Sequence, residues 1–365
     1  MISNSPDPTD EEVLADLRQR LRSTRRVSLP RGAGWDRGTD PDYLAALVQY
    51  WSDQYDWRAH ERRILSLPWV CTGTGTSALR SVHQLARSAG SPTVVLLHGW
   101  PDSVLRFERV LPLLGDVNVI VPALPGFPFS TRLDTLGMSV TTMATIVAES
   151  LQELGYDRYV VSAGDVGGDV AEQLAVAYPE RVAALHLTNL SPRHLRGVDT
   201  SQLSAHELAF LSSAQQWQMS EGGYIAEQST KPHTLAVGLG DSPAGLAAWI
   251  VEKLRSWSDC GGHVESAFAR DDLLTWITAY WVSGCIGTSF SSYAERPEPV
   301  KRVNTPTAMS VFPHDINIAP RALAERFLNI ESWVEHDAGG HFAAWEQPRA
   351  YIEGIRAAIA LGKTR

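Results

Sequence analysis

The chain has 365 residues, of which 44% are hydrophobic and 20% carry a charge. That length suffices for roughly two domains of about 150 residues each, or for one large core with an insertion. The ordinary Gly and Pro content and the low number of cysteines exclude a collagen-like repeat, a disulfide scaffold and a disordered chain. The net charge of −9 repels phosphate groups, so we expect neither a nucleic acid nor an anionic membrane surface as a partner.

Three features of the sequence indicate the cellular compartment. Cys71, Cys260 and Cys285 are widely spaced and include no CxxC pair, which argues against disulfides and against a thiolate metal site. The N-terminal sequence MISNSPDPTDEE is polar and acidic, where a signal peptide would be basic and then apolar. The longest apolar stretch, residues 273–287, is shorter than the roughly 20 residues of a membrane span. We therefore predict a cytoplasmic protein.

The periodicity of apolar residues changes along the chain. Amphipathic helical patterns over residues 11–22 and 41–55 predict a wrapping segment over residues 1–70. From residue 93 on, short apolar runs are followed by Gly and then by helical periodicity, which is typical of βα units in a largely parallel sheet. Strands are predicted over residues 93–97, 117–121, 158–162 and 182–187, and an amphipathic helix over residues 143–154.

The alternation of strand and helix stops after residue 190. Residues 191–300 have helical and irregular patterns rich in Trp, Ser and Gly, and strands return over residues 305–312 and 331–335. We predict an α/β fold with a mostly parallel sheet flanked by helices. Its core is in two parts, residues 71–190 and 301–365, separated by a helical insertion over residues 191–300.

A sharp turn is predicted where the strand over residues 158–162 ends. The sequence there reads AGDVGG, and small residues on both sides of Asp165 are what a tight strand-to-helix turn needs, since larger side chains would collide. Such a turn exposes its central side chain, as in the nucleophile elbow, where Ser is more common than Asp. A carboxylate there would form an ester with an alkyl carbon. The alternative is that Asp165 only caps the next helix, and this motif alone favours neither interpretation.

A second candidate segment, HGWP, directly follows the strand over residues 93–97. A tight turn at Trp100 would point backbone N–H groups into the space above the sheet, where they could hold an oxyanion. The alternative is an ordinary turn at the end of a strand.

A third candidate is His341, in a Gly-rich loop before the C-terminal helix. The order nucleophile, acid, histidine along the chain favours His341 as a base. We expect Asp315, just beyond the strand over residues 305–312, to orient it, in preference to Glu335 and Asp337, which lie on the strand or loop that carries His341 itself.

A metal site is a competing interpretation of the acids and histidines near the C-terminus, because imidazole and carboxylate are good ligands for Zn or Fe. The residues concerned are His314, Asp315, His336 and His341. They form no HExxH motif and have no tight ligand spacing. We therefore expect neither a metal nor an organic cofactor.

Together, HGWP, AGDVGG and GGHFAAWEQP resemble the epoxide hydrolases of the α/β-hydrolase fold, specifically the microsomal-type branch with its N-terminal domain. The resemblance covers nearly the whole chain. Segments at residues 17–25, 34–35, 43–44, 50–51 and 55–58 are similar to the N-terminal domain of that family, the loop VPALPGFPFS to one of its core loops, and residues 222–253 to its cap domain. The resemblance implies a small-molecule epoxide and water as substrates. Dimers are frequent among similar proteins, so a homodimer is one expected assembly.

The resemblance also implies a mechanism. Asp165 would attack an epoxide carbon and form an alkyl-enzyme ester. Tyr224 and Tyr293 match the two cap tyrosines that donate to the departing oxygen in the family. His341, oriented by Asp315, would then deprotonate the water that attacks the ester, and the product would be a vicinal diol.

The same resemblance assigns the oxyanion hole to the backbone N–H groups of Trp100 and Val166, and the substrate pocket to Trp100, Pro101, Phe127 and Val166. Two residues depart from the family pattern. Val166 stands where Trp usually follows the nucleophile, which should enlarge the pocket and suit a bulky, polycyclic or aryl epoxide. Asp102 stands where Gly is usual, and we expect it to do no more than cap the next helix.

Two other functions are compatible with parts of this pattern. A haloalkane dehalogenase shares the fold, the Asp nucleophile and the ester, but its halide is held by indole N–H donors, one of them from the position that Val166 occupies here. A non-catalytic ligand-binding protein of the same fold would be expected to have lost at least one catalytic residue. Tyr280, the third tyrosine of the insertion, is expected only to pack. An epoxide hydrolase is therefore the predicted function.

Overall fold

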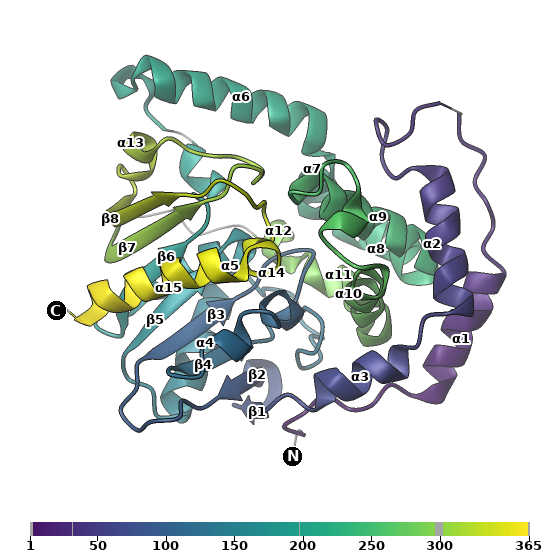
Figure 1. Ribbon diagram of the computed structural model, residues 1–365, viewed down its shortest axis with the longest axis horizontal. Coiled ribbons are helices and arrows are strands. Elements are labelled where there is room, and N and C mark those ends of the chain that lie inside the picture. Colours follow the sequence, from purple (N-terminus) through teal and green to yellow (C-terminus); the bar gives the residue numbers. More distant parts are fainter. Residues whose placement is uncertain (1–2, 31, 197, 296–301, 364–365) are drawn as a thin grey trace.

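The structure is a computed structural model that describes residues 3–30, 32–196, 198–295 and 302–363. Its centre is one sheet of eight strands: β1 (Trp69–Thr72), β2 (Leu79–Gln84), β3 (Thr93–Leu97), β4 (Asn118–Pro122), β5 (Tyr159–Ala163), β6 (Val182–Leu187), β7 (Val303–Val311) and β8 (Leu328–Glu335). In space their order is β1-β2-β4-β3-β5-β6-β7-β8 (Figure 1). β2 pairs antiparallel with β1 and β4, and all the other pairs are parallel. The sheet is thus mostly parallel, as predicted.

Helices cover the sheet, which explains why its central strands are continuous apolar runs. Every residue of β3 and of β5 is buried. Helix α15 (Pro348–Lys363) crosses the nearer face of the sheet in Figure 1 and contacts β6 and β7. Helix α4 (Val140–Glu153) packs on α5 (Asp165–Ala177), which contacts β3, β5 and β6. Two short helices, α13 (Arg321–Ala324) and α14 (Ala343–Glu346), follow β7 and β8 in the chain.

The sequence prediction and the structure agree on most strands. Those predicted over residues 93–97 and 182–187 coincide with β3 and β6. The strands predicted over residues 117–121 and 158–162 are each shifted by one residue, and β7 and β8 begin earlier than predicted. β1 and β2 are absent from the prediction because both are only partly buried, so they lack a continuous apolar run.

A helical insertion separates β6 from β7, as predicted. Its helices are α6 (Ala205–Glu221), α7 (Gly223–Thr230), α8 (Pro232–Asp241), α9 (Pro243–Trp257), α10 (Arg270–Ser283), α11 (Ile286–Ser289) and α12 (Ser291–Ala294). Side chains of α7 and α12 contact Trp100, directly after β3, so the insertion covers the carboxyl end of that strand. The predicted boundary between residues 300 and 301 lies outside the described residues.

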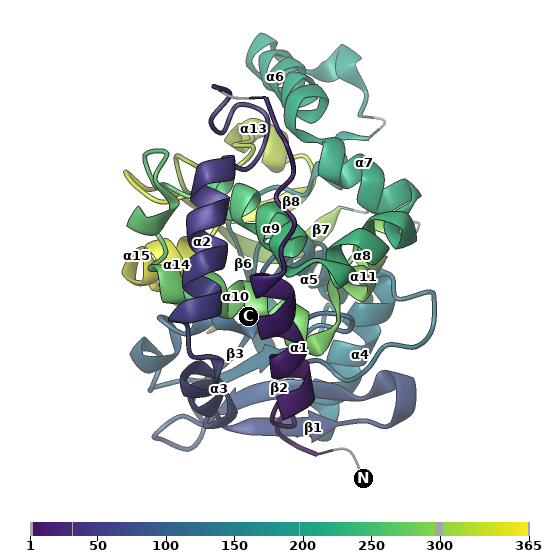
Figure 2. The ribbon, with the colours of Figure 1, turned by 90° about the vertical axis from the view of Figure 1, so that its right-hand side faces the viewer.

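The N-terminal helices pack against this insertion. They are α1 (Glu11–Arg22), α2 (Pro41–Asp53) and α3 (Trp57–Leu65). α1 and α2 contact α9, and Figure 2 shows both lying in front of the insertion. Three tyrosine hydroxyls fix the contact: that of Tyr43 donates to Glu265, that of Tyr50 donates to Asp271, and that of Tyr55 lies 3.0 Å from the Thr275 hydroxyl. The N-terminal segment therefore wraps the outside of the insertion.

Across the described parts of the chain, no single helix is long and apolar enough to cross a membrane. Helices α8 and α9 meet that criterion only when taken together, and they are bent by 115° at the break between them.

Candidate active site

Asp165 lies at the turn between β5 and α5, and the turn is strained. Its φ of 55° is uncommon for a residue with a side chain. Helix α5 begins at Asp165 itself, earlier than its apolar pattern suggests, and Gly164 occupies the N-cap with no side-chain cap. The Asp165 carboxylate is therefore not the helix cap. It points instead toward the turn after β3.

Two glycines allow this turn to approach its neighbours closely. A Cβ atom on Gly164 would lie 2.4 Å from the Thr188 hydroxyl, and one on Gly167 would lie 2.4 Å from the Leu97 carbonyl oxygen. Neither distance is compatible with a side chain. Gly164 and Gly167 are thus required by the packing of α5 against β3 and against the residues that follow β6.

His341 lies between two carboxylates. Its Nδ1 is 2.7 Å from Asp315 Oδ1, and its Nε2 is 3.5 Å from Asp165 Oδ2. The side chains of His341 and Asp315 are 3% and 4% exposed, whereas that of Asp165 is 15% exposed. Burial opposes a charge on His341, but the Asp315 carboxylate, together with Asp165, outweighs it and raises the pKa of His341 to about 9. Glu335 and Asp337, the alternative partners, are exposed.

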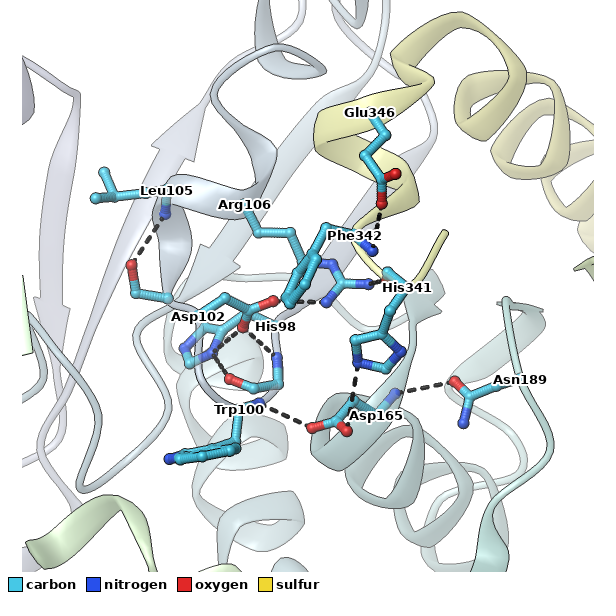
Figure 3. A network of polar contacts seen from close by, with 12 residues as sticks. His98, Trp100, Asp102, Leu105, Arg106, Asp165, Asn189, His341, Phe342 and Glu346 are labelled. Atoms are coloured by element: carbon cyan, nitrogen blue, oxygen red, sulfur yellow. Dashed lines mark hydrogen bonds and ion pairs between the residues drawn. The ribbon is translucent and has the colours of Figure 1, made fainter. Parts of the chain in front are cut away.

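The turn after β3 meets the Asp165 carboxylate. The backbone N–H of Trp100 donates to Asp165 Oδ1 over 2.8 Å, and the side-chain oxygen of Asn189 accepts from the Asp165 N–H at 3.0 Å (Figure 3). Val166 is 5% exposed and stands in the first turn of α5, where backbone N–H groups have no partner within the helix. The Trp100 N–H is therefore one backbone donor that contacts the carboxylate.

Aromatic side chains from the insertion surround Trp100. Tyr224 stacks on it with ring centroids 5.5 Å apart, and Tyr293 meets it edge-on at 6.0 Å. Trp257 and Phe290 complete the group at 6.1 and 6.3 Å. Burial and the charge of Asp165 raise the pKa values of both tyrosines well above the ordinary value, so both stay protonated and able to donate.

The remaining predicted pocket residues, Pro101 and Phe127, are both buried. Pro101 follows Trp100 in the turn. Phe127 is 1% exposed and packs edge-on against His98, with ring centroids 5.0 Å apart. Phe127 therefore packs against the first residue of the turn after β3. Tyr280 does more than pack, because its hydroxyl donates to the backbone carbonyl oxygen of Asp102 over 2.9 Å.

The role expected for Asp102 was wrong. It does not cap the following helix, where Ser103 accepts from the Leu105 N–H. Instead its buried carboxylate accepts from the Gly99 N–H at 2.7 Å and from Arg106 Nη1 at 2.5 Å (Figure 3). Burial alone would raise the pKa of Asp102, but Arg106 and His98 lower it to about 2. The sequence does contain a signal for this ion pair, because Asp102 lies four residues before Arg106 in an otherwise largely apolar segment.

Backbone contacts that no local sequence pattern predicts hold the His341 loop in place. The His341 N–H donates over 2.7 Å to the carbonyl oxygen of Trp257, the last residue of α9. The carboxylate of Glu346 accepts from the N–H groups of Gly340, Phe342 and Asp259. The insertion therefore takes part in positioning the loop.

The other histidines of the competing metal interpretation do not converge on this site. His314 Nε2 lies 3.4 Å from Asp259 Oδ1, and His336 stacks on Phe312 with ring centroids 4.5 Å apart. Within the described ranges, no three His, Cys, Asp or Glu side chains are grouped so that they could hold a metal ion.

Comparison with known proteins gives the family. Residues 7–107 match the family described as "Epoxide hydrolase N terminus", and residues 92–239 match "alpha/beta hydrolase fold". The chain is 34% identical to the "Putative epoxide hydrolase" of Stigmatella aurantiaca (strain DW4/3-1), over 95% of this chain and 82% of that protein. It is 30% identical to "Juvenile hormone epoxide hydrolase 2" of Ctenocephalides felis, over 96% and 83% of the two chains.

Solved structures agree with this. The epoxide hydrolase of Aspergillus niger superposes with a TM-score of 0.85, at 26% identity, over 98% of this chain and 96% of that chain. The fold, the similarity in sequence and the N-terminal segment therefore all relate this chain to epoxide hydrolases. The chain belongs to the epoxide hydrolase family of the α/β-hydrolase fold.

Proposed function

We propose that this protein converts an epoxide and water into a vicinal diol through a covalent ester on Asp165. One observation carries the proposal: the Asp165 carboxylate stands on a strained turn, 2.8 Å from the Trp100 N–H and 3.5 Å from His341 Nε2. A carboxylate at this point has a donor on one side and a potential base on the other.

The first step is ring opening. An oxygen of Asp165 attacks an epoxide carbon, and the bond between that carbon and the ring oxygen breaks. The ring oxygen takes a proton from Tyr224 or Tyr293, whose rings both contact the ring of Trp100. Their raised pKa values keep the phenol protons in place until the alkoxide forms.

The second step is hydrolysis of the ester. His341 takes a proton from a water molecule, which attacks the ester carbonyl carbon, while the N–H groups of Trp100 and Val166 stabilise the oxyanion. The tetrahedral intermediate collapses with cleavage of the bond between the Asp165 carboxyl carbon and the alkyl oxygen, and the proton held by His341 passes to that oxygen to complete the diol. The second proton of the water leaves the Asp165 carboxyl group and restores the tyrosine, so the carboxylate is free again. Formation of the ester removes the Asp165 charge that helps to raise the pKa of His341, so His341 becomes a neutral base more easily in the ester than in the free enzyme.

The substrate is proposed to be bulky, with an aryl or polycyclic group. Val166 replaces the larger indole usual after the nucleophile, and the side chains packed around Trp100 include the aromatic rings of Trp257 and Phe290. Aromatic surroundings of this kind favour a ligand with a large apolar surface.

The test is intact-protein mass spectrometry of the His341→Gln variant after exposure to styrene oxide and, separately, to a bromoalkane. Without the base, the ester should form and persist. We expect an adduct with the full mass of styrene oxide, mapped to Asp165 by fragmentation and absent from an Asp165→Ala/His341→Gln double variant.

The other outcomes point to different functions. An adduct from the bromoalkane alone, lacking hydrogen bromide, would assign a dehalogenase. If the wild type hydrolyses epoxides but the variant is never labelled, water attacks the epoxide directly or His341 is not the base. If wild type is inert toward a range of bulky epoxides, the protein is a ligand-binding member of the fold.

A further inference from the structure

Lys253 places a buried cation against one of the two candidate proton donors. It lies near the end of α9, and its side chain is 9% exposed. Its Nζ pairs with the neighbouring Glu252 and lies 5.0 Å from the centroid of the Tyr224 ring. The rings of Trp249 and Trp257 are also within reach, at 5.8 and 5.9 Å. The ammonium group therefore has aromatic faces around it in addition to one carboxylate.

We propose that Lys253 is a positioning residue for ring opening, whose ammonium group stabilises the negative charge that develops on Tyr224 as its proton passes to the epoxide oxygen. The inference rests on the function proposed above. A cation over an aromatic ring is attracted by the π electrons. A phenolate spreads part of its charge into the ring, so the attraction increases as the proton leaves, and it is strong because the site is buried.

The surroundings of Tyr224 show why such a cation matters. Burial, Asp165 and Glu252 each raise the pKa of Tyr224, so each opposes loss of its proton. Glu252 is the partner of Lys253, yet its charge acts on Tyr224 in the opposite sense. The two members of one ion pair should therefore have opposite effects on proton transfer, although they depend on each other equally for structure.

This opposition separates the proposal from a structural role. Lys253→Met and Glu252→Gln break the same ion pair. If the pair serves only to hold α9 in place, both changes should slow the reaction alike. If Lys253 acts on Tyr224, Lys253→Met should slow formation of the ester by about tenfold, Glu252→Gln should leave it equal or faster, and Lys253→Arg should stay within about threefold of the parent.

The rate of ester formation is measured in the His341→Gln background. Reactions with styrene oxide are quenched at timed intervals, and intact-protein mass spectrometry gives the fraction of protein that carries the adduct. Each variant is first compared with the parent by chemical unfolding. In a further Tyr224→Phe background, Lys253→Met should have no additional effect on the residual labelling rate. In a Tyr293→Phe background it should keep its full effect.

Three results would overturn the inference: equal slowing by Lys253→Met and Glu252→Gln, an effect of Lys253→Met that persists without the Tyr224 hydroxyl, or an unchanged rate in Lys253→Met. If Lys253→Met does not fold, slower ester formation in Glu252→Gln is by itself sufficient to contradict the inference about Lys253. Absence of labelling in the His341→Gln parent itself would instead contradict the proposed function, which keeps the two failures distinct.

Discussion

Arg106 and Asp102 form a buried ion pair, with 2.5 Å between Arg106 Nη1 and Asp102 Oδ2 and side chains that are 1% and 0% exposed. The same guanidinium donates to the backbone carbonyl oxygen of His341, and the same carboxylate accepts from the Gly99 N–H (Figure 3). One buried pair thus connects the turn that carries Trp100 to the loop that carries the candidate base.

Asp102→Asn should therefore destabilise the protein strongly. It leaves the Arg106 guanidinium buried without its counter-charge, and breaking such a pair from one side costs about 3–5 kcal/mol. Urea unfolding of wild type and variant measures the loss. The matched control is Asp134→Asn, since Asp134 pairs with Arg132 where the two side chains are 64% and 88% exposed, and no measurable change is expected there. Equal behaviour of the two variants would contradict the role given to Asp102.

Substitution by alanine at two adjacent glycines of α5, Gly167 and Gly168, should change the free energy of unfolding in opposite directions. A Cβ on Gly167 would meet the Leu97 carbonyl oxygen at 2.4 Å, whereas one on Gly168 would meet nothing within 4 Å. Gly167→Ala should lower the free energy of unfolding by about 1–3 kcal/mol and displace the Asp165 turn. Gly168→Ala should raise it by about 0.5–1 kcal/mol, because Ala restricts the unfolded chain and favours helix. Thermal unfolding measures both, and a loss in Gly168→Ala as large as that in Gly167→Ala would show that the close approach at β3 is not what requires Gly167.

The sequence predicts those parts of the site that leave a local pattern. The small residues around Asp165 and the apolar runs of β3 and β6 locate the turn and the strands on either side of β5. Asp315 follows from the chain order of a triad, and it lies 2.7 Å from His341.

Other parts leave no such pattern. The carbonyl oxygen of Trp257 accepts from the His341 N–H, but every residue has a carbonyl group, so only the fold reveals this contact. Asp102 was misassigned because the local sequence does not show that Arg106 turns inward to meet it. Edge strands such as β1 are missed because partial burial leaves a mixture of polar and apolar residues.

The charge on His341 should make stability depend on pH. Its pKa in the folded protein is raised from 6.5 to about 9, so the protonated form is favoured by folding. The resulting stabilisation is fully present below about pH 6.5 and is lost as the pH rises through about 9. Urea unfolding at a series of pH values should show that the excess stability of wild type over His341→Gln falls across this range. Asp315→Asn should reduce the fall, since Asp315 is the main source of the raised pKa, and a pH-independent difference would contradict the assignment.

Val166→Trp should change which epoxides the protein accepts. Val166 is 5% exposed and follows Asp165 on α5, so an indole there would occupy space beside the candidate nucleophile. We expect kcat/KM for stilbene oxide to fall by at least tenfold, because the indole would occupy space that this larger substrate needs. The kcat/KM for the small substrate propylene oxide should stay within about threefold of the wild-type value. Val166→Ala is the control, which should leave stilbene oxide hydrolysis intact. Equal losses for both substrates, accompanied by a lower unfolding temperature, would instead place Val166 in the packed core of α5, and the proposed preference for bulky epoxides would then lose its structural basis.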